Sequence, residues 1–251
     1  MDAASILARF DAEIRADPPA EAGYERVWVD GVLRTLGPLN FIGWWDFAAE
    51  AAPAIAAREA AFFAGRQLEW KVYSHDRPTG LSDALRAAGF EADEPETFLV
   101  LDLEAAMSDF DPPAGIEIRE VRDRRGAVDL EAVSAAAFGR EEPWRLEELV
   151  RRLDGPTLAM FVAYDGGVPV SSGRLELAPG TAFASLFGGG TRPDYRGRGV
   201  YRALVAARAA EARRRGVRFL TVDARETSRP ILQRIGFEPL ATINGWTLPT
   251  A

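Results

Sequence analysis

Apolar and polar residues alternate along the chain with two periods, one typical of helices and one typical of strands. Apolar positions three and four apart predict helices over residues 6–16, 47–64, 81–88, 127–137, 144–153, 228–235 and from the loop after residue 195 to about residue 215. Alternating or continuous apolar runs predict strands over residues 68–73, 97–103, 116–121, 157–164, 168–177, 182–187, 217–223 and 237–248. Helices that alternate with strands and hairpins predict an α/β fold with a mixed sheet.

Glycine, proline and asparagine mark the breaks between these elements. Asp30-Gly31 lies between two short apolar runs at residues 24–36 and predicts a hairpin, and residues 165–167 predict a second one. Asn244-Gly245 predicts a turn within the last strand, and Pro53 predicts a break or kink in its helix. Residues 109–115, which contain Asp-Pro-Pro, have the composition of a linker. We therefore expect one domain over residues 1–110 and a second over residues 111–251.

The two halves share an internal repeat. Residues 60–73 correspond to residues 211–223, and residues 81–91 correspond to residues 229–238. Each copy runs helix, glycine, strand, loop and helix, and each ends in Gly-Phe-Glu. The first copy lacks the loop rich in glycine and arginine that the second copy carries, so the same architecture is predicted twice with a single anion site.

Composition narrows the class of protein. The chain has 251 residues, 47% of them apolar and 27% charged, which is ordinary for a folded soluble protein. A net charge of −8 argues against general nucleic-acid binding. With no cysteine and only one histidine, the chain cannot form a disulfide, a thiolate or histidine-rich metal site, or a cysteine nucleophile. No apolar run reaches the ~20 residues that span a bilayer, and no basic, apolar leader opens the chain, so we expect a cytoplasmic protein.

The stretch from Phe183 to Leu204 carries the clearest chemical signal. An apolar run breaks at three glycines, crosses a proline and enters a basic loop that opens a long helix. The first backbone N–H groups of a helix have no partner within the helix, and the helix dipole adds positive charge there. Arginine also binds phosphate in a bidentate fork, and three arginines surround this loop, namely Arg196, Arg198 and Arg202. A ligand that carries phosphate is therefore predicted.

Two common phosphate-binding motifs do not fit the loop. A dinucleotide fingerprint needs G-x-G-x-x-G/A, whereas the chain from Gly197 to Arg202 has arginine at the last position. A Walker loop needs a lysine before Ser or Thr, and the only lysine of the chain is Lys71. A nucleotide-binding module nevertheless stays open as a possible function, which tight binding of ATP or NAD would support.

The loop resembles the acyl-CoA site of the GCN5-related N-acetyltransferases, the GNAT family, whose pattern is Gln/Arg-x-x-Gly-x-Gly/Ala after a strand exit with proline and tyrosine. Here Thr191-Arg-Pro-Asp-Tyr195 leads into Arg196-Gly-Arg-Gly-Val-Tyr201. The closing helix and Gly-Phe of that family correspond to Ser228–Phe237, and the order of elements agrees from about Ile116 to Leu248. The first half looks like a degenerate copy of the same domain, as in tandem members of the family.

The resemblance implies an acyl-CoA N-acyltransferase-like fold and acetyl-CoA as co-substrate, with no metal. Backbone groups of Gly189, Gly190 and Thr191 would pair with the pantetheine arm. The loop and the first turn of the helix would hold the pyrophosphate, through Arg196, Gly197, Arg198, Gly199, Val200, Tyr201 and Arg202. Ser228 is expected to cap the last helix, and a contact with CoA is an alternative for it.

By this resemblance the chain would transfer acetyl from acetyl-CoA to the primary amine of a small molecule by direct attack, as a monomer or a homodimer. Two residues depart from the pattern: Tyr201 stands at the final Gly/Ala, and Leu232 replaces the tyrosine that often serves as general acid. Leu232, together with the absence of a carboxylate from the strand at residues 182–187, makes a non-catalytic acyl-CoA-binding or sensor protein the alternative.

Amine acyl transfer also needs a base, or a chain of waters, to accept the ammonium proton. Asp223 ends the strand after the long helix and is the first candidate for the base. Glu176 and Glu226 are further candidates. The sequence does not rank the tyrosines that could replace the acid, which are Tyr73, Tyr164 and Tyr195.

Overall fold

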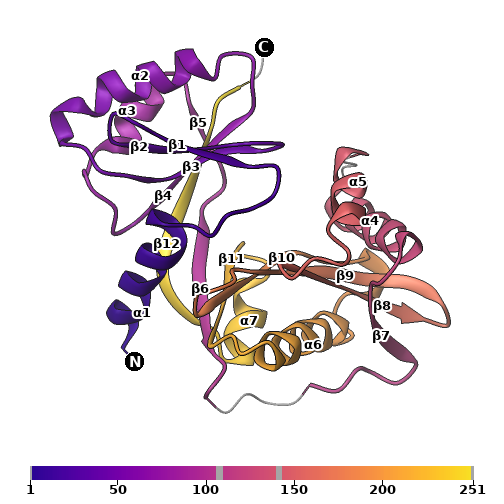
Figure 1. The fold of residues 1–251 in the computed structure, drawn as a ribbon. Coiled ribbons are helices and arrows are strands. Elements are labelled where there is room, and N and C mark those ends of the chain that lie inside the picture. The colour runs from indigo at the N-terminus through magenta and orange to yellow at the C-terminus, as the bar shows by residue number, and fades with distance from the viewer. Residues whose placement is uncertain (1, 106–109, 140–142, 250–251) are drawn as a thin grey trace. The chain divides into compact units, whose positions relative to one another are not determined.

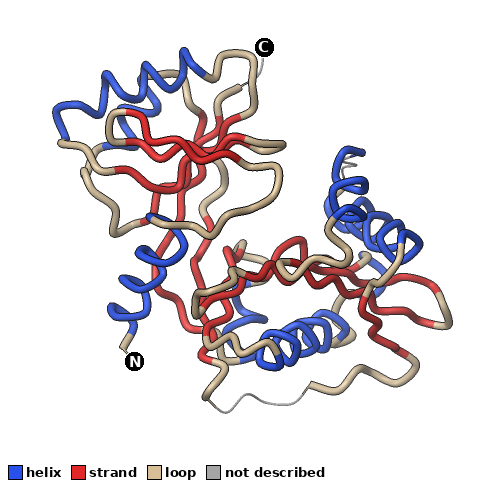
Figure 2. Tube along the Cα trace, viewed as in Figure 1, coloured by secondary structure: helices blue, strands red, loops and turns tan. Residues whose placement is uncertain are grey.

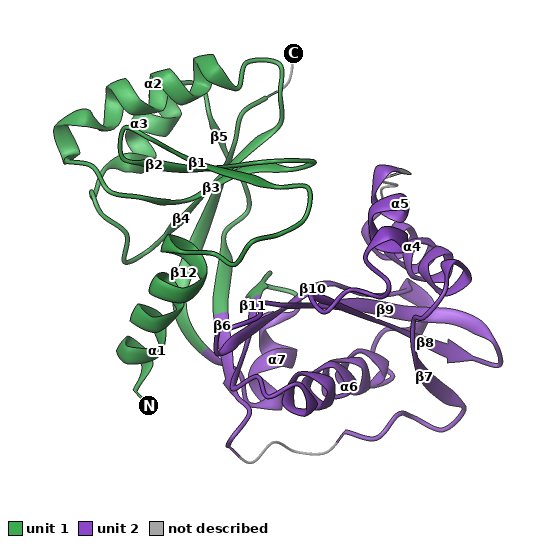
Figure 3. Cartoon of the chain, viewed as in Figure 1, with its two compact units in different colours: residues 1–98, 223–227, 239–251 green, residues 99–222, 228–238 purple. Residues whose placement is uncertain are grey.

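The computed structural model describes residues 2–105, 110–139 and 143–249. The chain divides into two compact units, each of which takes segments from both halves of the sequence (Figure 3). Unit 1 consists of Met1–Phe98, Asp223–Thr227 and Pro239–Ala251. Unit 2 consists of Leu99–Val222 and Ser228–Glu238.

Unit 1 is built on a sheet with the strand order β1-β2-β3-β4-β12, and a short strand, β5, pairs with β12. All of its strand pairs are antiparallel except β3–β4, which is parallel. Its strands are β1 (Glu25–Val29), β2 (Val32–Leu36), β3 (Asn40–Trp45), β4 (Leu68–Tyr73), β5 (Glu91–Ala92) and β12 (Glu238–Thr247). Its helices are α1 (Ala3–Phe10), which continues as a π-helix over Asp11–Ala16, α2 (Ala52–Phe62) after a 3-10 turn at Ala49–Ala51, and α3 (Leu81–Ala87).

The main core of unit 1 lies between its sheet and the pair α2 and α3. Trp70 is fully buried at its centre, and the Trp45 and Phe90 rings meet it edge-on. Because side chains alternate along a strand, Trp70 and Tyr73 of β4 point to opposite faces. Tyr73 contacts Phe10 of α1, which covers the second face of the sheet.

Unit 2 has a sheet of strand order β6-β11-β10-β9-β8-β7, in which β10 and β11 are parallel and the pairs from β7 to β10 are antiparallel. Its strands are β6 (Glu96–Asp102), β7 (Ile116–Glu120), β8 (Leu158–Asp165), β9 (Val168–Leu177), β10 (Phe183–Thr191) and β11 (Phe219–Ala224). Its helices are α4 (Arg124–Phe138), α5 (Pro143–Arg151), α6 (Val200–Arg214), which follows a 3-10 turn at Pro193–Tyr195, and α7 (Arg229–Ile235).

Helices cover both faces of the sheet in unit 2. Figure 1 shows α4 and α5 on one face and α6 and α7 on the other, and Figure 2 shows these layers as blue helices around red strands. Local signals define α4, because the Asp123 carboxylate accepts a hydrogen bond from Gly126 N and Gly139 ends the helix in the left-handed conformation. The predicted fold class, α/β with a mixed sheet, is confirmed.

The two halves of the sequence exchange their last strands between the units. β12 ends the second half of the sequence, yet residues 239–247 belong to unit 1, where Ile243 pairs with Tyr73 and Thr247 with Glu69 of β4. Conversely, β6 ends the first half, and its residues 99–102 belong to unit 2, whose sheet places β6 beside β11. The predicted division into domains over residues 1–110 and 111–251 stays a prediction.

Several local predictions differ from the structure. Asn244 and Gly245 form no turn but pair with Val72 and Lys71 within a continuous β12. A turn there would break the pairing with β4, so the sheet overrides the local preference. Pro53 occupies the first turn of α2, where a missing N–H costs nothing, and it does not kink the helix. Residues 40–45 form β3, a strand that the sequence pattern did not predict.

Candidate functional site

The site begins where β10 separates from β11. The two parallel strands are in register only from Phe183 with Phe219 to Ser185 with Thr221. β10 then continues to Thr191, held on its other side by β9. The edge of β10 after Ser185 therefore presents backbone groups that are not in register with β11, and an extended ligand can pair with such an edge.

A β-bulge lies in this part of β10. Phe187 is opposite Arg174 of β9 and Gly190 is opposite Ser172, so two residues, Gly188 and Gly189, face the single residue Gly173. Gly188 has φ +57°, which a residue with a side chain seldom adopts. Such a bulge re-aims the strand and frees backbone groups from the ladder.

The glycines at the bulge let two helices approach the sheet. A Cβ at Gly173 would lie 2.6 Å from Arg208 Nη1 of α6. A Cβ at Gly189 would lie 3.1 Å from Tyr201 Cε2, and one at Gly190 would lie 2.8 Å from Ala137 Cβ of α4. The side-chain positions of these glycines thus face protein atoms, while the strand edge toward β11 carries the groups that could pair with a ligand.

Two side chains hold the end of β10. Ser171 Oγ donates a hydrogen bond to the Gly190 carbonyl at 2.7 Å and lies 2.8 Å from Thr191 Oγ1. Arg196 Nε donates to the Thr191 carbonyl at 3.2 Å, and its Nη2 donates to the Ala137 carbonyl at 3.2 Å. Arg196 therefore fixes the loop to β10 and α4. Its predicted contact with phosphate stays a prediction.

The helix start after the loop is open to an anion. Gly197 and Gly199 adopt φ +74° and +84°, and Gly199 is the N-cap of α6 without a side-chain capping hydrogen bond. The first backbone bond of the helix runs from Ala203 N to the Gly199 carbonyl at 3.2 Å. The N–H groups of Val200, Tyr201 and Arg202 precede that bond and point out of the helix start, as an anion site requires.

Two arginines flank this helix start with their guanidinium groups over aromatic rings. Arg198 lies over Tyr195 at 4.7 Å, and Arg202 lies over Phe110 at 5.2 Å. Both residues are exposed, so their charge is available to a ligand from solvent. Loop, glycines and arginines are thus brought together in unit 2 as the sequence predicts, although their role in binding is not tested by the geometry alone.

The model of the acetyltransferase (GNAT) family matches residues 117–237, which include the bulge, the loop, α6 and the closing Gly-Phe. Residues 117–237 are a GNAT domain. The chain therefore carries an acyltransferase domain. No sequence among the curated proteins matches the chain.

Solved structures of GNAT proteins share the fold over nearly the whole chain. A GCN5-related N-acetyltransferase from Kribbella flavida is 17% identical, with a TM-score of 0.66, covering 99% of this chain and 95% of its own. A tandem GNAT protein from the clavulanic acid biosynthesis pathway is 17% identical, with a TM-score of 0.63, covering 93% of this chain and 85% of its own. A GCN5-related N-acetyltransferase from Sphaerobacter thermophilus is 14% identical, with a TM-score of 0.62, covering 98% and 85%. At these identities the likeness establishes the fold.

Position 232 of the GNAT domain carries no proton donor in the structure. Leu232 of α7 is fully buried and belongs to the core. Ser228 is the N-cap residue of α7, but its side chain makes no capping hydrogen bond, contrary to the expected cap. Leu232 therefore cannot supply the acid that the family pattern would place on this helix, and the alternative contact of Ser228 with CoA stays a prediction.

Asp223, the candidate base, is held by a lysine. Lys71 Nζ donates a hydrogen bond to Asp223 Oδ2 at 2.7 Å, and both residues belong to unit 1. Burial disfavours the ammonium, but the charges of Asp223 and Glu69 more than offset this, so the pKa of Lys71 lies well above its ordinary value. Lys71 is therefore cationic at neutral pH, and its ammonium occupies the Asp223 carboxylate.

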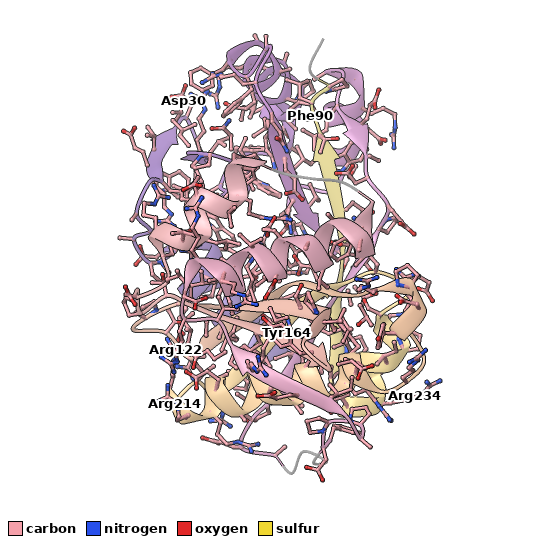
Figure 4. The ribbon with its side chains drawn as sticks, turned by 90° about the vertical axis from the view of Figure 1, so that its right-hand side faces the viewer. Asp30, Phe90, Arg122, Tyr164, Arg214 and Arg234 are labelled. Atoms are coloured by element: carbon pink, nitrogen blue, oxygen red, sulfur yellow. The ribbon has the colours of Figure 1, made fainter. Side chains whose placement is uncertain are left out.

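The other candidates for proton transfer are occupied by protein contacts. Glu176 pairs with Arg152 at 2.5 Å and with Arg174 at 3.4 Å. Tyr164 of β8, labelled in Figure 4, donates to Asp129 Oδ2 at 2.9 Å, and burial with this bond raises its pKa to about 12. Tyr195 donates to Asp165 Oδ2 at 3.0 Å, which raises its pKa.

Tyr73 and Glu226 complete the set of candidates. Tyr73 is buried in unit 1, and burial together with the charge of Asp223 raises its pKa. Glu226 is exposed in the turn after β11. Asp223 stays the first candidate for the base.

The sequence analysis did not identify several residues that contact the bulged part of β10. Gly173, Ser171 and Arg208 were not singled out, and Lys71 was noted only as the single lysine. A signal for Arg208 existed, because it lies seven residues after Tyr201 on the helix face that otherwise holds Leu204, Val205 and Ala212. A charged residue on a buried helix face is unusual.

Proposed function

We propose that the chain is an N-acetyltransferase that transfers acetyl from acetyl-CoA to the primary amine of a small molecule. The observation that carries this proposal is the start of α6, where uncapped N–H groups follow two left-handed glycines at the end of the bulged strand β10. This arrangement lies within the segment that matches the GNAT family. A pyrophosphate suits this helix start, and the free edge of β10 suits the pantetheine arm.

In the proposed complex the pantetheine arm would pair with the backbone of Gly189, Gly190 and Thr191. The pyrophosphate would accept hydrogen bonds from the N–H groups between Gly197 and Arg202, and the exposed guanidinium groups of Arg198 and Arg202 would add charge. Thr191 supports this assignment, because Ser171 engages its hydroxyl and Arg196 its carbonyl, which fixes the strand end before the ligand arrives.

The chemistry is a direct attack by a neutral amine nitrogen on the thioester carbonyl. A C–N bond forms, the carbonyl electron pair moves to oxygen, and the C–S bond then breaks to release CoA. A base removes the ammonium proton, and the departing sulfur takes a proton from water in the absence of a tyrosine at position 232. We assign the base to Asp223, acting directly or through ordered water, after the carboxylate leaves Lys71.

The test of the proposal is acetyl-dependent release of CoA across a panel of small primary amines. Release that requires both acetyl-CoA and an amine, with the acetylated amine identified by mass spectrometry, supports the transferase. Binding of acetyl-CoA without release for any amine supports instead a non-catalytic acyl-CoA-binding or sensor protein. The buried Leu232 and the Lys71–Asp223 ion pair favour that second function.

The role of Asp223 has its own test. With a responsive amine, Asp223→Asn should lower kcat by about 10²-fold, because general base catalysis contributes on that order. Asp83→Asn, at an exposed carboxylate of α3 that pairs with Arg86, is the matched control and should leave kcat within about twofold. A kcat unchanged by Asp223→Asn at all pH values assigns deprotonation to solvent and removes Asp223 from the mechanism.

A further inference from the structure

Arg208 is a buried cation beneath the bulge of β10. Its exposed fraction is 0%, and its guanidinium lies under Gly173 and Gly189 of neighbouring strands. Nε donates to the Leu204 carbonyl of its own helix at 3.2 Å, and Nη1 donates to the Arg174 carbonyl of β9 at 3.2 Å. Nη2 makes no hydrogen bond of good geometry among the described residues, although the nearby Tyr201 hydroxyl interacts with the guanidinium. It lies 3.3 Å from where a Cβ of Gly189 would be.

No carboxylate balances this charge in the part of the chain that the structure describes. The titratable groups that act on Arg208 are Tyr201, whose hydroxyl also lies beneath Gly189, and Arg174, which carries the same charge. Burial, with a smaller contribution from Arg174, lowers the pKa of Arg208 to about 10, so the residue remains charged at neutral pH. An isolated buried charge is costly, and apolar side chains fill the rest of this helix face.

The Arg208 guanidinium lies next to the bulge of β10, where it can interact with a charge on a ligand. The bulge interrupts the ladder opposite Gly173, and Nη1 takes up the carbonyl of Arg174, the next residue of β9. The glycines at positions 173 and 189 leave no side chain between the guanidinium and the strand backbone. The Arg208 guanidinium thus places a positive charge on the α6 side of β10 at the bulge, where β10 is no longer in register with β11.

We infer that Arg208 is a positioning residue for acyl transfer, whose charge acts through the bulge of β10 to stabilise the oxyanion that forms on the thioester. The inference rests on the proposed function, in which the pantetheine arm runs along Thr191, Gly190 and Gly189, so that the thioester at the far end of the arm meets β10 at the bulge. When the amine nitrogen bonds to the carbonyl carbon, the π electrons become a full charge on oxygen, and that charge is the missing counter-ion of Arg208. When the C–S bond breaks, the carbonyl re-forms and the charge leaves with the sulfur.

A preorganised charge of this kind favours the transition state over the neutral substrate. It therefore affects kcat more than the affinity for acetyl-CoA. A purely structural role for Arg208 predicts something else, because a guanidinium that only clamps the Arg174 carbonyl would stabilise the fold and would be indifferent to charge on the ligand.

The experiment compares Arg208→Met, Arg208→Lys and the control Arg213→Met in the full chain. Arg213 lies on the same helix and donates to a backbone carbonyl, that of Leu103, at 3.1 and 2.9 Å, but no bulge lies above it. The probes are acetyl-CoA and S-carboxymethyl-CoA, which carries a carboxylate in place of the acetyl group. Dissociation constants are measured by calorimetry, and melting temperatures by scanning calorimetry.

The inference predicts that Arg208→Met lowers the preference for carboxymethyl-CoA over acetyl-CoA at least tenfold, with the Kd of acetyl-CoA within threefold of that of the unchanged protein. The melting temperature should stay equal or rise, because an unbalanced buried charge is removed. Arg208→Lys keeps the charge and should keep most of the preference. With a responsive amine, Arg208→Met should lower kcat about tenfold to hundredfold with little change in KM.

Other outcomes overturn it. An unchanged preference in folded Arg208→Met, or a preference lost in Arg208→Lys, shows that the charge does not act on the acyl group. If Arg208→Met does not fold, the Arg208→Lys result alone decides whether the charge acts on the acyl group. If the unchanged protein binds neither CoA compound, the proposed function fails, and the inference falls with it. An unchanged preference in a protein that binds acetyl-CoA removes the inference alone.

Discussion

At the scale of single residues, the site depends on places where a side chain is missing. Gly173 and Gly189 let α6 lie close enough for Arg208 and Tyr201 to reach the strand backbone, and Gly190 does the same for α4. The positive φ values of Gly197 and Gly199 turn the chain into the helix start. Glycine therefore serves two different purposes within one short stretch, close packing in the strand and backbone conformation in the loop.

Gly173→Ala tests the close packing. The new Cβ would lie 2.6 Å from Arg208 Nη1, so the buried guanidinium would have to shift away from the Leu204 and Arg174 carbonyls to which it donates. We expect a loss of about 1–3 kcal/mol in the free energy of unfolding, measured by urea denaturation. Gly43→Ala is the control, because its Cβ would lie an ordinary 3.5 Å from Phe41. A Gly173→Ala protein as stable as the control would contradict this packing.

At the scale of elements, some ion pairs join a helix to a sheet, and others join residues at the end of one helix. In unit 1, Arg34 of β2 donates to Glu59 of α2 at 2.6 and 2.9 Å, and the Glu59 side chain is fully buried. The Arg34 guanidinium also lies 3.8 Å from the Phe62 ring centroid. In unit 2, Glu211 near the end of α6 accepts hydrogen bonds from Arg214 and Arg215.

Removal of one partner of the buried pair should cost far more than removal of both. Glu59→Ala leaves the Arg34 charge without its main partner, and we expect a loss of about 3–5 kcal/mol in the free energy of unfolding. The double variant Arg34→Met/Glu59→Leu replaces the pair by apolar groups and should lie within about 1 kcal/mol of the unchanged protein. Equal losses in the single and double variants would show that the helix and strand need the ions themselves.

Glu211 should make stability depend on acid. The hydrogen bond from Arg214, with further help from Arg215, lowers the pKa of Glu211 from 4.5 to about 2 in the folded state. Above pH 5 the group is ionised in both states, so its stabilisation is complete. As the pH falls from 5 toward 2, the unfolded chain takes up the proton first and that stabilisation is lost.

In the Glu211→Gln protein, the free energy of unfolding should therefore depend less on pH between pH 5 and 2. At pH 7 it should be lower by about 1 kcal/mol, after allowance for solvent screening of a site near the surface. Urea denaturation at several pH values measures this. The double variant Arg214→Met/Arg215→Met should flatten the same limb, and an acid limb that keeps its slope in both proteins would assign it to other carboxylates. Arg214 is labelled on the ribbon in Figure 4.

At the scale of the whole molecule, the sequence predicted what depends on local pattern and missed what depends on distant partners. Helical and strand periods, hairpin turns and the glycine-rich loop are local, and the fold class and family that they indicated are confirmed. The exchange of β6 and β12 is not local, since strand pairing joins residues such as Tyr73 and Ile243. Asn244-Gly245 shows the consequence, because a good turn dipeptide remains a strand where β4 requires one.

The candidate site divides in the same way. The loop and its arginines lie together in unit 2 because they are close in sequence. The Lys71–Asp223 ion pair joins residues 152 positions apart, and Arg208 of α6 contacts the backbone at Gly173 of β9. No local pattern in the sequence reveals either contact.

Among the described residues, no helix has both the length and the apolar content needed to cross a membrane.

The central claim is that the start of α6 binds acyl-CoA and that only the second copy of the repeat has this site. Calorimetric titration with acetyl-CoA tests it most directly, with Gly199→Asp and Gly199→Asn beside the unchanged protein. Both variants accept the left-handed backbone of φ +84° about equally, but only aspartate brings negative charge to the helix start.

The account predicts one acetyl-CoA bound per chain, binding at least tenfold weaker in Gly199→Asp than in Gly199→Asn, and an affinity that falls with added salt. Two molecules bound per chain, equal binding by both variants, or no binding by the unchanged protein would contradict it.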